Sequence, residues 1–420
     1  MNLVWSTITA STSDHCEVIV DGREGTSRAI IYPDLTGPAQ VGDRALLNTT
    51  AVDLGLGTGG DHFVVAIIKK DEQPQGVAYS DESGGHLMKL RYAPLQRDVL
   101  AIEAPEATTH AIMEKVSSLE DIPVVCCGLH SQMPIVAATI KAHAPHLRIG
   151  YIMTDQAALH LGYSRMAKQC IERGLLDATI TVGQALGGQY EAINLYSGML
   201  GGCHVCGCDV LIVAIGPGVA GTSTPFGHGG IAQGEAINAA ASLGGRPIAV
   251  LRMSFADTRE RHQGISHHTL TALETVARAP AIIAVPAIAD EADRRKVEEQ
   301  LDAIQGFVDH QGVFFEDPVF DQAYLGDLKV TTMGRGFDED PVFFEAAAAA
   351  GVLAAQIGTV SAEQAISDFY DTIKKEGLPS TGDTGSGAEE GTDSTCTPSA
   401  CSSCPLTCAP PTPEPPSDRQ

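Results

Sequence analysis

Residues 122–155 read IPVVCCGLHSQMPIVAATIKAHAPHLRIGYIMTD, and this stretch decides the fold class. The apolar run at 122–127 predicts a buried strand, and the periodic apolar residues after it predict a helix that ends near residue 143. A second apolar run at 147–153 predicts another strand. Strand, helix and strand in this order form a βαβ unit, whose two strands lie parallel in one sheet.

The same alternation continues along the chain. We expect strands at 178–182, 209–215, 247–253 and 281–285, and helices that end near residues 173 and 202 or span 231–243 and 266–278. Further helices, among them an alanine-rich one at 341–357, and a strand at 328–332 complete the pattern. The predicted fold class is therefore α/β, with a Rossmann-like, doubly wound and mostly parallel sheet.

Five short β-rich runs precede this pattern, at 3–9, 16–20, 28–32, 44–48 and 63–68. Because turn residues separate them, they predict a small closed or half-closed β-barrel. We expect a barrel domain at 1–70, a linker and extended connecting segment at 71–100, and the α/β domain at 101–378. Residues 379–420 are rich in Gly, Ser, Thr, Pro and acid, which predicts a disordered tail.

The formal net charge of -25 disfavours nucleic acid and anionic membranes as partners, because both bind through basic surfaces. The first 22 residues hold no Lys or Arg, which argues against a signal peptide, and we find no apolar run near the ~18 residues of a membrane helix. A cytoplasmic protein is expected, and homo-oligomerisation is left open.

The cysteines predict packed, reduced thiols rather than disulfides, with Cys126 and Cys127 in a strand pattern and Cys170 in a helical one. The set Cys203, His204, Cys206, Cys208 lacks the paired spacing of a structural zinc site, so core packing is favoured. For the tail set Cys396, Cys401, Cys404, Cys408, disorder without a metal is favoured, with zinc or redox reactivity as the alternative.

Residues 216–221 read GPGVAG, the spacing of a dinucleotide fingerprint. The segment comes late in the sheet, contains Pro217 and is not followed directly by a helix, which disfavours a nicotinamide site, and the absence of a Lys disfavours a triphosphate P-loop. The loop still offers donors to an anion, and a tight turn that caps the next helix is an equal alternative. The candidate anion ligands here are Gly216, Gly218, Gly221, Thr222, Ser223 and Thr224.

Residues 254–268 read SFADTRERHQGISHH and form the densest polar cluster. Ser266 is a plausible N-cap, which puts His267 and His268 in a first helical turn, where the dipole favours neutral imidazoles. Arg259 and Arg261 are suited to a phosphate or carboxylate, and Asp257 is suited to orienting a histidine or joining a metal shell. The alternative is a surface loop with paired charges and a capping motif.

Three more loops are expected at the same carboxyl edge of the sheet. They contribute His130 as acid or base, Asp155 as base, metal ligand or simple N-cap, and Gly187 and Gly188 as ligand-binding positions. A serine hydrolase built on His130 and Ser131 is disfavoured, because the chain has no G-x-S-x-G elbow.

Several of these segments resemble a bacterial family catalogued as domain of unknown function 3866. The resemblance spans about residues 1–360 and rests on GLHS at 128–131, GYIMTD at 150–155, GPG at 216–218, FAD at 255–257 and GISHH at 264–268. It implies no activity, cofactor or site residue.

The leading hypothesis is an enzyme for a small anionic metabolite, with the 216–224 loop and Arg259 holding the anion. His262, His267, His268 or His130 would act as acid or base with Asp257 or Asp155. One alternative is a non-catalytic sensor or adaptor, and another is a divalent-metal hydrolase using Asp155, Asp257 and histidines. The sequence identifies no cofactor, and we assign no residue as a metal ligand.

Overall fold

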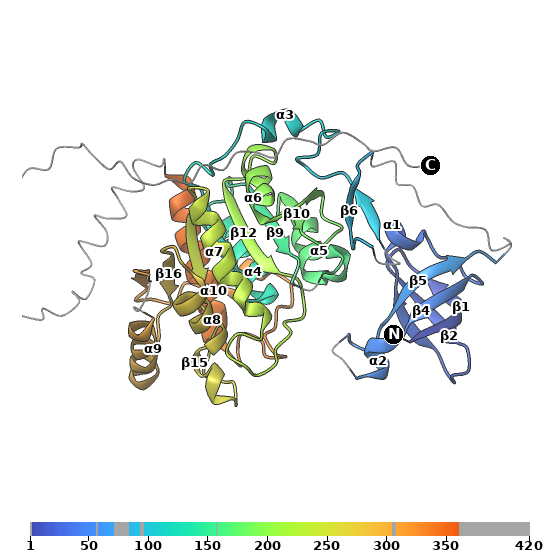
Figure 1. The fold of residues 1–420 in the computed structure, drawn as a ribbon. Coiled ribbons are helices and arrows are strands. Elements are labelled where there is room, and N and C mark those ends of the chain that lie inside the picture. The colour runs from blue at the N-terminus through green and yellow to red at the C-terminus, as the bar shows by residue number, and fades with distance from the viewer. Residues whose placement is uncertain are drawn as a thin grey trace, which may run out of the picture. The chain divides into compact units, whose positions relative to one another are not determined.

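A sheet of eight parallel strands forms the centre of the α/β part of the chain (Figure 1). The computed structural model describes residues 2–55, 58–70, 84–92, 96–156, 158–304 and 308–360. Most of the expected linker, residues 361–378 and the tail with its cysteines lie outside these ranges. The strand order is β11 (Tyr190–Ala192), β10 (Ala178–Val182), β9 (Ile149–Thr154), β12 (Val210–Ile215), β8 (Pro123–Cys126), β13 (Arg246–Val250), β16 (Ile282–Val285) and β17 (Gln311–Phe314).

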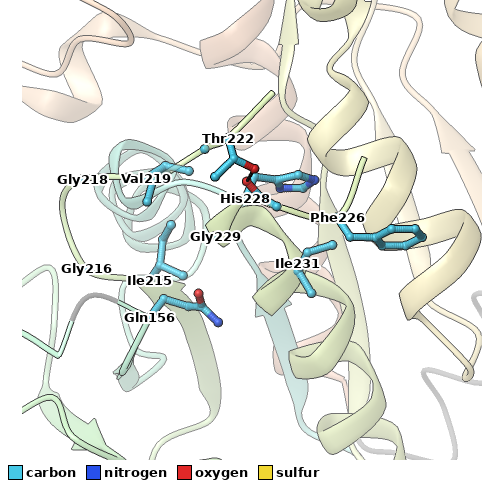
Figure 2. Close-up of a pocket in the computed structure, with 13 residues that line it drawn as sticks. Gln156, Ile215, Gly216, Gly218, Val219, Thr222, Phe226, His228, Gly229 and Ile231 are labelled. Atoms are coloured by element: carbon cyan, nitrogen blue, oxygen red, sulfur yellow. Dashed lines mark hydrogen bonds between the residues drawn. The ribbon is translucent and has the colours of Figure 1, made fainter. Parts of the chain in front are cut away.

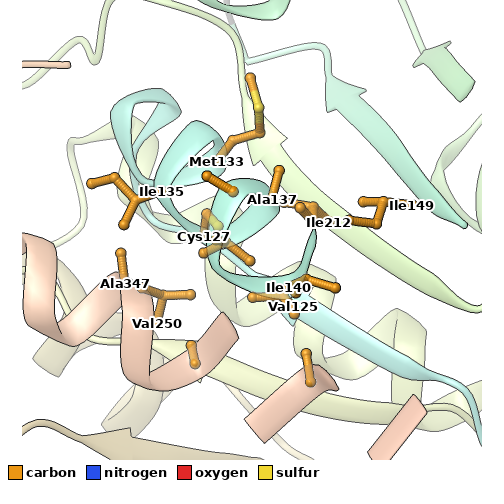
Figure 3. Close-up of a cluster of buried hydrophobic side chains, with 14 of the residues drawn as sticks. Val125, Cys127, Met133, Ile135, Ala137, Ile140, Ile149, Ile212, Val250 and Ala347 are labelled. Carbon is orange, nitrogen blue, oxygen red and sulfur yellow. The ribbon is translucent and has the colours of Figure 1, made fainter. Parts of the chain in front are cut away.

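Two hydrophobic cores cover the two faces of this sheet, because successive side chains of a strand point to opposite faces. In β8 and the residue after it, Val125 and Cys127 belong to one core and Val124 and Cys126 to the other. Helices α4 (Met133–His143), α5 (Arg165–Glu172) and α10 (Pro341–Thr359) pack in the first core, shown in Figure 3, and α6 (Leu195–His204) and α7 (Ala232–Ser242) pack in the second. The α/β prediction with a parallel sheet is confirmed.

Helix α10 corrects the expectation that no apolar run reaches membrane-spanning length. The helix has 19 residues and contains an 18-residue window with a mean hydropathy of 1.5, which is long and apolar enough by length and composition alone, but 83% of that window is buried inside the fold. Its phenylalanines and alanines pack against α4 and the sheet. The composition of α10 is therefore that of a core helix.

A closed five-stranded barrel forms the N-terminal part, as predicted. Its strands follow the order β1 (Leu3–Ser11), β2 (His15–Val20), β3 (Ser27–Ile30), β5 (His62–Ile68) and β4 (Arg44–Asn48). Alternate residues such as Ile8, Val18 and Leu47 fill its interior. The short elements α1 (Pro33–Thr36), α2 (Thr50–Asp53), α3 (His110–Met113) and the two-stranded pair β6 (Leu87–Lys89) and β7 (Arg97–Val99) complete the N-terminal third.

The structure differs from the prediction in three places. The predicted strand at 328–332 is wrong, because the chain forms only an isolated bridge between Thr332 and Arg335, and β17 follows α9 (Glu291–Ala303) instead. The edge strand β11 was not predicted. The predicted helix at 266–278 is α8 (His267–Thr271) followed by a π-helical turn at Ala272–Val276. That turn packs closely on α7, since a Cβ at Gly234 would lie 2.7 Å from the Ala272 carbonyl oxygen.

Candidate functional site

Loops that follow β8, β12 and β13 converge on one cavity at the carboxyl edge of the sheet, with a volume of about 430 Å³. This volume lies within the range of small-molecule sites. Buried glutamines fix the loops from below. Gln233 donates to the carbonyl oxygens of Cys126 and Val250, and Gln132 donates to that of Leu251. The ends of β8 and β13 are thereby held together beneath the cavity.

A short hairpin brings the polar cluster of residues 254–268 into this cavity. Strand β14 (Met253–Ser254) pairs antiparallel with β15 (Gly264–Ile265), so the intervening loop leaves and returns at one place. Ser266 then caps α8, accepting a hydrogen bond from the His268 backbone N–H at 3.3 Å, as the sequence predicted. His262 and His267 thus face each other with ring centroids 5.0 Å apart.

Four histidines meet in the cavity: His228, His262, His267 and His268. The rings of His228 and His268 stack with centroids 3.9 Å apart, and the centroids of His267 and His268 are 4.3 Å apart. His228 was not predicted as a site residue. It follows the glycine-rich segment that was predicted as part of the site. A search for histidines near that segment would have found it.

Burial and neighbouring arginines keep these imidazoles neutral at pH 7. Burial is the largest cause in each case, and it lowers the pKa of His262 to about 4 and that of His268 to about 2. The pKa values of His228 and His267 are also lowered. The sequence predicted neutral imidazoles from the helix dipole, whereas the structure attributes them to burial and to the positive charge of Arg252 and its neighbours.

Three arginines, Arg252, Arg259 and Arg261, line the same cavity. Arg252 is 8% exposed and its Nη1 donates to Nδ1 of His268 at 2.9 Å. Among the residues that the structure describes, no carboxylate lies within ion-pair distance of Arg252 or Arg261. Positive charge is therefore concentrated and only partly neutralised here, as expected from the sequence, in which Arg252, Arg259 and Arg261 form a local positive stretch suited to a small anion.

Asp257 holds an arginine instead of serving as a base. Its carboxylate accepts bonds from Nε and Nη2 of Arg259 at 2.9 and 2.7 Å, and Nη2 of Arg335 lies 3.5 Å away. The hydrogen bonds from Arg259 hold the pKa of Asp257 far below its usual range. A carboxylate this acidic is a poor proton acceptor, so the structure argues against the catalytic assignment of Asp257. Nη1 of Arg259 has no hydrogen-bond partner among the described residues, so it is left for a ligand.

The glycine-rich loop separates the cavity from a second one of about 400 Å³ (Figure 2). A turn that pairs Gly221 with His228 brings His228 beside Thr222. Gly218 and Gly221 line both cavities, Ser223 and Thr224 line the first, and Gly216 and Thr222 line only the second. Within the described ranges, the backbone N–H groups of Gly218, Gly221 and Ser223 have no acceptor, whereas the hydroxyl of Thr222 donates to Gly227.

Four predicted positions are not available to a ligand in the cavity. His130 lines it but is 4% exposed, and its ring nitrogens lie 3.1 Å from the Tyr151 hydroxyl and 2.6 Å from that of Ser164. Asp155 is not among the lining residues and accepts a bond from the Gln184 backbone N–H. The backbone N–H groups of Gly187 and Gly188 donate to side chains of Glu191 and Thr181, because this loop returns alongside β10.

Thr332 and Met333 close one side of the cavity. They belong to a tight turn in which Met333 has a φ of 49°, a conformation uncommon for a residue other than glycine. The sequence pattern suggested a strand at this position and gave no signal for a site.

A family profile described as "Protein of unknown function (DUF3866)" matches residues 28–351. No curated protein matches the chain, and no solved structure matches it.

Proposed function

Because the chain belongs to the family described as protein of unknown function (DUF3866), we propose its function from the site alone: an enzyme that acts on a small phosphate- or carboxylate-bearing metabolite. The anion would lie between Arg252 and Arg261, with the free edge of Arg259 and the backbone N–H groups of the 218–223 segment as further donors.

The observation that carries this proposal is that two guanidinium groups at the cavity, the buried Arg252 and the exposed Arg261, have no carboxylate partner among the described residues of a chain of net charge -25. A buried cation without a counter-ion is costly, and burial together with the other arginines lowers the pKa of Arg252 to about 10. A bound anion would remove this cost. The expected selectivity is therefore for anions over neutral or cationic compounds.

The neighbouring imidazoles support an enzyme over a passive binding protein. Nδ1 of His262 lies 2.7 Å from the Ser266 hydroxyl, and Nε of Arg261 points at Nε2 at 3.5 Å, a pattern that fits Nδ1–H as donor and Nε2 as the lone pair. With a pKa of about 4 the imidazole of His262 is a weak base in the empty cavity, but a bound anion would offset the charge of the arginines and raise this pKa toward the range of a general base. We assign this role to His262, and a non-catalytic sensor remains the competing proposal. The free cysteines of the described residues fit the reducing cytoplasm that we propose as its location.

Titration of the full chain with inorganic phosphate tests the anion site. Arg261→Gln should weaken binding by about tenfold or more, because one charge-assisted hydrogen-bonding group is lost. Arg294→Gln is the matched control, since Arg294 is an exposed arginine on α9 that pairs with Glu298. Calorimetry in which the wild type fails to bind phosphate, or in which both variants bind like the wild type, would contradict the proposal.

A screen of phosphate- and carboxylate-bearing metabolites by mass spectrometry tests catalysis. We expect a compound that the wild type converts and that His262→Gln binds without converting. A compound that is bound but never converted by the wild type would favour the sensor instead.

A further inference from the structure

Two buried imidazole nitrogens at the cavity have no hydrogen-bond partner among the residues that the structure describes: Nδ1 of His228 and Nε2 of His267. Buried polar atoms almost always have a hydrogen-bond partner, so these two nitrogens call for an explanation in terms of a missing partner. One ring nitrogen from each of His228, His267 and His268 lies within 4.8 Å of the other two. Three imidazoles thus offer nitrogens close together at the edge of the cavity, and because the rings of His228 and His268 are stacked with planes 9° apart, one of these two rings must turn before both can ligate a single ion.

The hydrogen bonding of His228 shows which of its nitrogens carries the proton. Nε2 of His228 lies 3.1 Å from the Pro225 carbonyl oxygen, which can only accept, so Nε2 bears the hydrogen and Nδ1 bears the lone pair. A ring N–H that donates to a backbone carbonyl is the usual support of a metal-ligating histidine. The lone pair is also uncrowded only because residue 230 is glycine, since a Cβ there would lie 3.0 Å from Nδ1.

We propose that His228, His267 and His268 ligate a divalent first-row transition metal of the zinc type, at a site open to the cavity. Three neutral imidazoles suit Zn²⁺, Co²⁺, Ni²⁺ or Fe²⁺ and do not suit Mg²⁺ or Ca²⁺, which take oxygen ligands. Three protein ligands leave at least one position free, which is the pattern of catalytic rather than structural zinc. The inference deepens the proposed function and rests on it for the anion, which would reach the metal from the arginine side.

Arg252 competes with the metal for His268. Its guanidinium donates to Nδ1, so this nitrogen is the lone pair and Nε2 carries the proton. A metal at Nδ1 would displace the guanidinium, and a metal at Nε2 would require the proton to move to Nδ1, where Arg252 already donates. Coordination through either nitrogen therefore requires Arg252 to leave His268.

The anion of the proposed function is the acceptor to which Arg252 would turn. Metal binding and anion binding then favour the same position of Arg252, so each should strengthen the other by the same factor. The departure of Arg252 also frees the imidazoles to move inward, from up to 4.8 Å between ligand atoms toward the about 3.4 Å of a tetrahedral site with bonds of about 2.05 Å.

Cobalt(II) is the probe, because tetrahedral Co²⁺ absorbs strongly in the visible and a thiolate ligand adds a separate near-ultraviolet band. The full chain, purified without a histidine tag and stripped of metal, should bind one Co²⁺ with the tetrahedral spectrum and without the thiolate band. Phosphate should raise the Co²⁺ affinity. His267→Ala should lower it at least tenfold, and the exposed His146→Ala, the matched control, should not change it.

Arg252→Met distinguishes metal binding from phosphate binding. It leaves all three of the proposed metal-ligating histidines in place. It should raise Co²⁺ affinity in the absence of phosphate, because the competing guanidinium is gone, and lower phosphate affinity.

Absence of Co²⁺ binding in the wild type with phosphate and in Arg252→Met would overturn the metal site, even if phosphate still binds. Co²⁺ that shows a thiolate band or survives His267→Ala would overturn it too. Co²⁺ binding without any phosphate binding would instead overturn the anion proposal.

Discussion

Asp257 and Arg259 illustrate, at the scale of single residues, why residue type alone does not define a role. Both were candidates from the sequence. Two short hydrogen bonds between them occupy both carboxylate oxygens of Asp257 and the Nε and Nη2 groups of Arg259. Arg252 and Arg261 keep their charge available to the cavity. The arginines that matter for an anion are those whose charge no described carboxylate neutralises, and such pairing is a property of the tertiary structure.

His130 is a buried histidine outside the four-histidine cluster, and its titration should be felt in stability. Burial lowers its pKa from 6.5 to about 4, while in the unfolded chain it titrates near 6.5. Between these pH values the unfolded chain binds a proton that the folded chain does not, so acidification destabilises the fold. A shift of this size corresponds to about 3 kcal/mol, present in full above pH 6.5 and lost as the pH falls to 4.

We therefore predict that the free energy of unfolding depends on pH more steeply in the wild type than in His130→Gln. From pH 7 to pH 4 the free energy of unfolding of the wild type should fall by about 3 kcal/mol more than that of His130→Gln, which does not titrate. Urea denaturation at steps of half a pH unit measures both. Parallel curves would mean that His130 does not have the lowered pKa.

At the scale of elements, the close approach of α10 to α4 explains why α10 is rich in small residues. A Cβ on Gly351 would lie 2.9 Å from Cβ of Thr139, and the neighbouring Ala350 is fully buried. Interiors packed this densely do not absorb added methylene groups without strain. The helix is apolar because it is a core element.

Ala350→Leu should therefore destabilise the α/β part by about 1–3 kcal/mol. Gln356→Leu adds the same side chain to an exposed position of the same helix and should leave the free energy of unfolding nearly unchanged. The urea midpoints of the two variants and the wild type give the comparison. Equal midpoints for both leucine variants would contradict the packing described here.

The elements that could be predicted from the sequence are those whose pattern is local and strong. The buried strands β8, β9, β12 and β13 lie in largely apolar runs, β10 carries β-branched residues throughout its last four positions, and the barrel strands are separated by clear turn residues. The edge strands β11 and β17 were missed because they are three and four residues long, with half-buried side chains that give little apolar signal.

The sequence predicted which loops form the site, but not all of the residues that line it. The rule that parallel strands bring their trailing loops to one edge correctly identified the 216–228 and 254–268 segments. It could not show that Asp155 binds the neighbouring loop, that Gly187 and Gly188 run back along β10, or that His228 joins the other histidines. Those outcomes depend on loop conformations, which local sequence patterns specify only weakly.

At the scale of the whole molecule, the charge distribution is the clearest functional feature. The chain carries a formal charge of -25, yet Arg252, Arg259, Arg261 and Arg335 gather near one cavity with the carboxylates of Asp257 and Asp340. An acidic surface repels anions at long range, so a local excess of guanidinium groups must act at contact distance. Binding by such a site should weaken as salt screens it.

The most direct test is a crystal structure of the full chain grown with phosphate. We expect phosphate within hydrogen-bond distance of Arg261 and Arg252, with the Arg252 guanidinium turned from His268 toward the anion. Phosphate bound elsewhere, or Arg252 still donating to His268 with the cavity filled only by water at saturating phosphate, would contradict it.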